Sequence, residues 1–209
     1  MPTLAYIAGA MSFVPAAVGL ARYGRLDKSM RAFTIFAIIG SISVTVEFCL
    51  GKLGITNYFL ADIYYLLSML LLAIVYHWSI SGKRAQNMLK GAAIVYFLVW
   101  AVDEICFANR SQVNSTLAMI SSIFLVIISM VALQTLLRTP KERLTAQPVF
   151  WISTGTILYS AGSFLVFGLS NELLKLSLAY FTIAWHINWI LYIVSMLMFT
   201  KGLLCKSQV

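Results

Sequence analysis

The sequence predicts an all-α polytopic membrane protein, a single seven-helix transmembrane bundle that takes up residues 1–209. Hydrophobic residues make up 61% of the chain and charged residues 11%, with a mean hydropathy of +0.89. A soluble domain is about half apolar and about a quarter charged. Because one crossing with its loop takes roughly 28 residues, the 209 residues suffice for about seven crossings and leave no separate soluble domain.

Apolar stretches long enough to cross a bilayer as helices follow one another along the chain. They cover about 3–21, 32–51, 57–80, 89–108, 116–137, 149–169 and 177–200. None alternates in the manner of a transmembrane β-barrel strand. Short polar connections separate them, at 22–31, 51–56, 81–86, 109–115, 138–148 and 170–176. Pro15 lies well inside the first stretch, where a proline is expected to kink the helix.

Basic residues predict how the bundle is oriented. All but three of the 15 Lys and Arg residues follow the first, third, fifth and seventh stretches, the exceptions being Lys52, Arg110 and Lys175. Because Lys and Arg in short loops are retained in the cytoplasm, the N-terminus is predicted outside and the C-terminus inside. Anionic lipid heads on the inner face account for the net charge of +8. The basic residues form no single stripe, which argues against nucleic acid as a partner.

Four of the seven acidic residues lie inside apolar stretches and toward the predicted outer side: Glu47, Asp62, Asp103 and Glu104. A charged side chain near the bilayer centre costs at least ~3 kcal/mol, so such residues usually mark a ligand pocket, a proton relay or an ion path. The acids therefore give the best indication of function in this sequence.

Polar and aromatic residues three, four or seven apart share helix faces with these acids. We expect them to line an outward-facing acidic, aromatic cavity that binds a small ligand or protons. Its predicted ligand-binding residues are Glu47, Asp62, Tyr65, Trp100, Asp103, Glu104, Tyr159, Ser163, Trp185, His186 and Asn188. The alternative for the hydroxyl and amide groups is interhelical hydrogen bonding. The alternative for His186 is a hydrogen-bonded core histidine.

Residue counts argue against several kinds of site. A three-histidine zinc site is excluded because the chain has two histidines, and His77 lies at a different depth from His186. Lys175 and Lys201 lie at the two ends of the last stretch, where neither suits a retinal Schiff base. No nucleophile-elbow, zinc-protease or P-loop motif occurs. We therefore expect no cofactor and no metal, and assign no catalytic residue.

The C-terminal third resembles uncharacterised bacterial seven-helix membrane proteins and the helical sensor modules that precede histidine kinases in some bacterial chains. The similar segments are 148–152, 158–164, 185–188 and 199–202. The resemblance implies a sensor or receptor-like module in the bacterial cytoplasmic membrane. Since the sequence ends at Val209, we expect its output to pass to a separate cytoplasmic signalling partner, or through a homo-oligomer.

A receptor-like sensor that signals by helix rearrangement is thus the favoured prediction. The first alternative is an intramembrane lipid hydrolase, with Asp62, Asp103 and His186 as acid, base and orienting group. The second is a small transporter or channel subunit, which ranks lower because no inverted repeat is visible.

Overall fold

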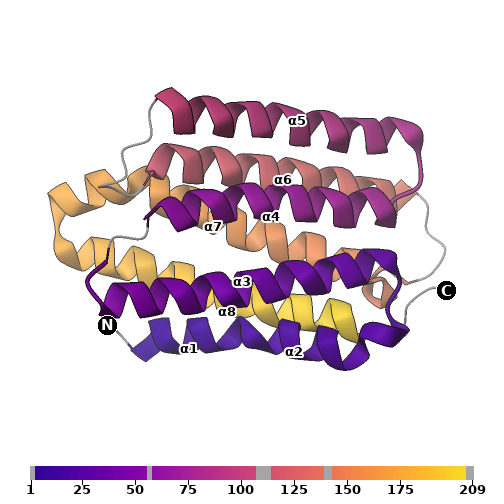
Figure 1. Ribbon diagram of the computed structural model, residues 1–209, viewed down its shortest axis with the longest axis horizontal. Coiled ribbons are helices and arrows are strands. Elements are labelled where there is room, and N and C mark those ends of the chain that lie inside the picture. The colour runs from indigo at the N-terminus through magenta and orange to yellow at the C-terminus, as the bar shows by residue number, and fades with distance from the viewer. Residues whose placement is uncertain (1–2, 56–57, 107–113, 139–142, 206–209) are drawn as a thin grey trace.

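A computed structural model describes residues 3–55, 58–106, 114–138 and 143–205, and these contain helices but no strand (Figure 1). Eight α-helices and two short 3-10 helices follow one another in these ranges. They are α1 (Thr3–Met11), α2 (Phe13–Arg22), η1 (Tyr23–Arg25), α3 (Lys28–Lys52), α4 (Tyr58–Ser79), α5 (Lys83–Cys106), α6 (Ser115–Arg138), η2 (Leu144–Ala146), α7 (Pro148–Leu176) and α8 (Leu178–Leu204).

Six helical segments among the described residues are long and apolar enough to cross a membrane. They are Thr3–Arg25, Lys28–Lys52, Tyr58–Ser79, Ser115–Arg138, Pro148–Leu169 and Leu178–Leu204. This confirms the all-α class and indicates an integral membrane protein. The predicted stretch 89–108 is helical as far as Cys106, within α5, but α5 is not among the six. It carries charged residues at both ends, so a count of seven crossings remains a prediction.

Local signals explain where the helices begin and end. α3 begins four residues before the predicted stretch because the Asp27 carboxylate accepts a hydrogen bond from Met30 N at 2.8 Å and caps the helix. The candidate membrane-crossing segment of α7 ends at Leu169, and the predicted connecting residues 170–176 continue the same helix to Leu176. This segment is polar but contains neither Gly nor Pro, and Lys175 pairs with Glu172 one turn away at 2.7 Å.

The first crossing is interrupted near Pro15, as the sequence predicts. α1 ends at Met11 and α2 begins at Phe13. Pro15 has no N–H with which to bond the Met11 carbonyl, so the helical hydrogen-bond series cannot continue there. The N–H and the hydroxyl of Ser12 both turn back to Gly9 O, at 3.2 and 2.7 Å.

The helices form a ring with one helix outside it. α3 packs against α2 and α4, α4 against α6, α6 against α7, and α8 against α7, α1 and α2. α5 packs against α4 and α6 and lies at the edge of the bundle (Figure 1). The ring is filled by large buried side chains. Phe33 of α3 lies 5.2 Å from Phe199 of α8, centroid to centroid, and Tyr76 of α4 is completely buried.

Charges of opposite sign gather at opposite ends of the bundle. The N-termini of α3, α5 and α7 and the C-terminus of α8 lie at one end, here the basic end (Figure 1). It carries Arg22, Arg25, Lys28, Lys83, Arg84, Arg138, Arg143 and Lys201. The other end, the acidic end, holds Glu47, Asp62, Asp103 and Glu104. This separation agrees with the predicted charge asymmetry, while the side of the membrane that each end faces remains a prediction.

Two glycines allow the orientation to be tested with little disturbance. Gly24 at the basic end and Gly51 at the acidic end are exposed, and a Cβ added to either meets nothing within 4 Å. In a cysteine-free background, Gly51→Cys is expected to react with a membrane-impermeant thiol reagent added to intact cells. Gly24→Cys is expected to react only after lysis. The reverse pattern would show that the N-terminus is cytoplasmic.

Candidate functional site

The carboxylates at the acidic end gather where α5 packs on α4. The Asp62 side chain on α4 is buried, with 8% of its surface exposed, and it lies within electrostatic range of Glu104 and Asp103 on α5. Both α5 acids are partly buried. The indole Nε1 of Trp100 donates to the backbone oxygen of Asp62 at 3.0 Å. This bond fixes α5 against α4 at the level of the three carboxylates, which we call the α4–α5 acid cluster.

Asn114 joins this cluster to α6. Its Nδ2 donates to Asp103 Oδ2, and its Oδ1 accepts from Leu117 N at 3.0 Å. One amide therefore caps α6 and holds an α5 carboxylate. This residue is not among the predicted ligand-binding residues. The available signal was an asparagine directly before an apolar stretch, which is a common N-cap pattern.

Glu47 and several tyrosines form a second group. Ser43 Oγ donates to Glu47 Oε1 at 3.1 Å one turn away on α3. Tyr65 of α4 and Tyr159 of α7 lie within electrostatic range of Glu47, and Tyr65 is also within range of Asp62. Tyr65 is therefore near both groups. Tyr64 and Tyr192, which are not among the predicted ligand-binding residues, join this group, with the Tyr192 ring 5.2 Å from that of Tyr159.

Ser163 and Asn188 join α7 to α8. Ser163 Oγ donates to Asn188 Oδ1 at 3.1 Å, and both side chains are buried. This geometry matches the interhelical hydrogen bonding given as the alternative for these residues.

Trp185 and His186 lie among aromatic side chains of α7 and α8. The Trp185 ring contacts Phe167 at 5.7 Å and Trp189 at 6.3 Å, and His186 also contacts Trp189. The ring Nδ1 of His186 is 2.6 Å from Thr182 O on its own helix. None of these contacts joins His186 to Asp62 or Asp103, as the hydrolase alternative requires. Within the described ranges, no group of three or more His, Cys, Asp or Glu residues is arranged to hold a metal ion.

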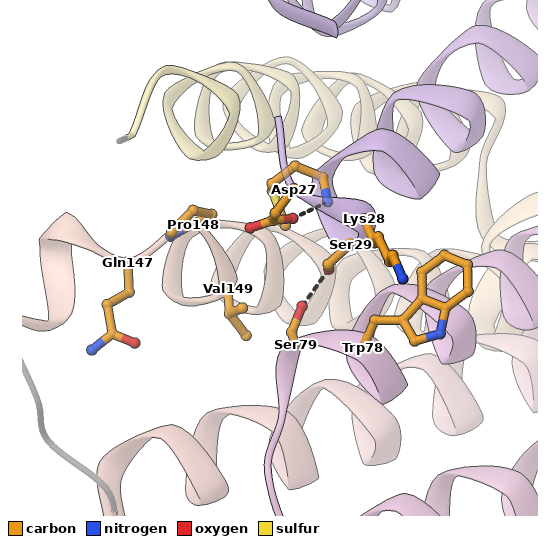
Figure 2. A pocket seen from close by; sticks show the side chains of 9 residues that line it. Asp27, Lys28, Ser29, Trp78, Ser79, Gln147, Pro148 and Val149 are labelled. Carbon is orange, nitrogen blue, oxygen red and sulfur yellow. Dashed lines mark hydrogen bonds between the residues drawn. The ribbon is translucent and has the colours of Figure 1, made fainter. Parts of the chain in front are cut away.

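A cavity lies at the basic end, where no site was predicted. It has a volume of about 360 Å³ and lies between the start of α3, the end of α4 and the start of α7 (Figure 2). Ser29 Oγ donates to Val75 O at 2.8 Å and hydrogen bonds to Ser79 Oγ, which joins α3 to α4 beside the cavity. The lining residues of this α3–α4–α7 pocket are Asp27, Lys28, Ser29, Met30, Trp78, Ser79, Gln147, Pro148 and Val149.

The acidic end and the α3–α4–α7 pocket are therefore separate sites at opposite ends of the bundle. Comparison with protein-family models, with curated proteins and with solved structures finds no match for this chain. The resemblance to sensor modules remains a prediction.

Proposed function

We propose that this chain is a seven-crossing membrane sensor that recognises a small cationic ligand through the α4–α5 acid cluster at its outer end. The observation that carries the proposal is the buried Asp62 carboxylate, which has Asp103 and Glu104 beside it on a neighbouring helix. Negative charges repel strongly in surroundings of low dielectric constant. A cation bound between them would relieve this repulsion and gain charge-assisted hydrogen bonds.

α5 is the helix best placed to respond to such a ligand. It lies outside the ring and packs against α4 and α6. At the acidic end, two hydrogen bonds hold α5 in place. The Trp100 indole donates to the backbone oxygen of Asp62, and the Asn114 amide donates to the Asp103 carboxylate. A cation at Asp103 would compete with the Asn114 amide, so ligand binding would favour a different position of α5 relative to α6. The other end of α5 begins at Lys83, at the basic end, where a cytoplasmic partner would detect the movement.

The test uses the full chain in lipid nanodiscs and three organic cations: spermidine, which donates N–H hydrogen bonds, and choline and tetramethylammonium, which have no N–H. At least one cation is expected to raise the melting temperature of the wild type, because binding to the folded state stabilises it. Asp62→Asn is expected to abolish that rise. The matched control is Glu172→Gln, which changes an exposed carboxylate of α7 at the same end.

A fluorophore on Gly91→Cys reports α5 movement, since a side chain there has open space around it. Its emission is expected to change with the stabilising cation in the wild type but not in Asp62→Asn. The proposal fails if no probe stabilises the protein, or if Asp62→Asn responds as strongly as Glu172→Gln.

A further inference from the structure

A small cavity lies inside the bundle beside the interruption of the first crossing. Four of its lining residues carry hydroxyl groups and come from different segments: Ser12 between α1 and α2, Ser41 of α3, Tyr64 of α4 and Tyr192 of α8. Pro15, which lacks the N–H that would continue the helix, also lines it. We call this space the Ser12 cavity. It shares no lining residue with the α3–α4–α7 pocket.

The size of the Ser12 cavity suits one water molecule. Its volume is about 20 Å³. A polar cavity needs at least about 10–15 Å³ to hold a water, whereas sites for small organic ligands have roughly 300 Å³ or more. None of the residues that line it is charged, so no group there would balance the charge of a bound ion. Water is therefore the ligand that fits.

The two serines offer such a water hydrogen-bond acceptors. Ser12 Oγ donates to Gly9 O at 2.7 Å, and Ser41 Oγ donates to Ser12 O at 2.8 Å and Ala37 O at 2.9 Å. A hydroxyl has a single proton, which these bonds use, so lone pairs remain on both serine oxygens. Both serines are almost completely buried, with 2% and 4% of their surfaces exposed. Bulk solvent therefore does not supply partners for these lone pairs.

The two tyrosines can donate to the same water. A Cβ added at Gly40, which also lines the cavity, would lie 3.0 Å from the Tyr64 hydroxyl oxygen. That oxygen is therefore close to the backbone of α3. Tyr192 lies within electrostatic range of Tyr64. Since a phenol hydroxyl can both donate and accept, the cavity offers more partners than the about three hydrogen bonds that a buried water makes.

The rest of the cavity wall is apolar. Phe36, Ala37, Met196 and Phe199 line it, and each is buried. Polar groups enclosed by such side chains are costly unless they are hydrogen bonded. Ordered waters and Ser or Thr side chains are known to satisfy polar backbone groups that a proline frees in a membrane helix. A water in this cavity would lie where such a role is needed, beside Pro15.

We propose that the Ser12 cavity holds one ordered water that bridges Tyr64 to the serines at the interruption of the first crossing. The water accepts from Tyr64 Oη and donates to Ser12 Oγ and Ser41 Oγ. Because Tyr64 belongs to the Glu47 group, the water connects that group to the first crossing. The inference does not rest on the proposed cation site, since none of the carboxylates of the α4–α5 acid cluster lines the cavity.

The first measurement is a double-mutant cycle on reversible unfolding of the full chain in mixed micelles. Tyr64→Phe and Ser12→Ala are each expected to raise the equilibrium constant for unfolding about fivefold or more, because each removes a hydrogen bond to the water. The double variant is expected to show about fivefold less than the product of the two effects, since the second substitution removes a bridge that is already broken. Effects that simply multiply would overturn the proposal.

The matched control pairs Tyr64→Phe with Ser129→Ala. Ser129 is also a buried serine, but its Oγ lies 2.9 Å from the hydroxyl of Tyr76, twelve residues further along α4. Twelve residues of helix span about 18 Å, so these two effects are expected to multiply to within about twofold. If Ser12→Ala does not fold, Ser41→Ala replaces it with the same expected coupling to Tyr64→Phe.

The second measurement is a pair of crystal structures, of wild type and of Tyr64→Phe, at a resolution that shows buried waters. Wild type is expected to show a density peak within hydrogen-bond distance of Tyr64 Oη and Ser12 Oγ. The peak is expected to be lost in Tyr64→Phe. A wild-type map that shows other interior waters but none here, or an unchanged peak in Tyr64→Phe, would refute the bridging water.

Discussion

Replacing Tyr76 by alanine is expected to lower the free energy of unfolding by about 3 kcal/mol, the lower end of the range for removing a buried aromatic ring. Tyr76 of α4 is completely buried at the crossing of three helices. Its hydroxyl lies 2.9 Å from Ser129 Oγ on α6 and 3.5 Å from Thr156 Oγ1 on α7. We take the lower end because lipid tails are as apolar as the core, so the loss is mainly one of packing.

Two further variants serve as controls. One distinguishes the stability contributed by the Tyr76 ring from that of its hydroxyl, and the other measures the effect of removing an exposed tyrosine. Tyr76→Phe keeps the ring and is expected to cost about 1 kcal/mol, the net contribution of a hydrogen bond. Tyr180→Ala removes a tyrosine that is 58% exposed and is expected to cost under about 0.5 kcal/mol. The measurement is reversible unfolding in mixed micelles. If Tyr76→Ala were as stable as Tyr180→Ala, the described packing of α4, α6 and α7 around Tyr76 would be contradicted.

Gly155→Leu is expected to destabilise the protein by about 3 kcal/mol through overpacking between α7 and α8. A Cβ at Gly155 would lie 2.8 Å from Phe199 Cε1 and 3.2 Å from Met198 Cβ. The Phe199 ring is held by Phe33 at 5.2 Å and cannot easily move away. Ser195 Oγ donates to Gly155 O at 2.9 Å, which shows how closely the two helix backbones approach.

The matched control is Gly91→Leu on α5, where a Cβ meets nothing within 4 Å. Both substitutions replace a helical glycine by the same residue, so they share the same gain in helix propensity. Gly91→Leu is therefore expected to be neutral or slightly stabilising in the same unfolding assay. Equal effects of the two substitutions would show that α7 and α8 do not pack in the arrangement described.

The sequence by itself determined the helical class, the approximate extent of the crossings and the separation of charge between the two ends. These follow from local physics: the length of an apolar helix is set by bilayer thickness, and each carboxylate's depth follows from its distance to the end of its helix. Asp62, Asp103 and Glu104 could be placed at one level in this way. The interruption near Pro15 was predictable because a proline blocks a hydrogen bond four residues back on the same helix.

Only the tertiary structure decided which helix faces meet. A polar stripe predicts that a helix face is buried but not which neighbouring helix it meets, so the sequence could not place α5 outside the ring. It could not pair Asn114 with Asp103, because that hydrogen bond depends on how α5 meets the start of α6. The α3–α4–α7 pocket escaped prediction for the same reason. Asp27, Trp78 and Gln147 belong to three different segments, and they become one site only when the ends of those helices meet.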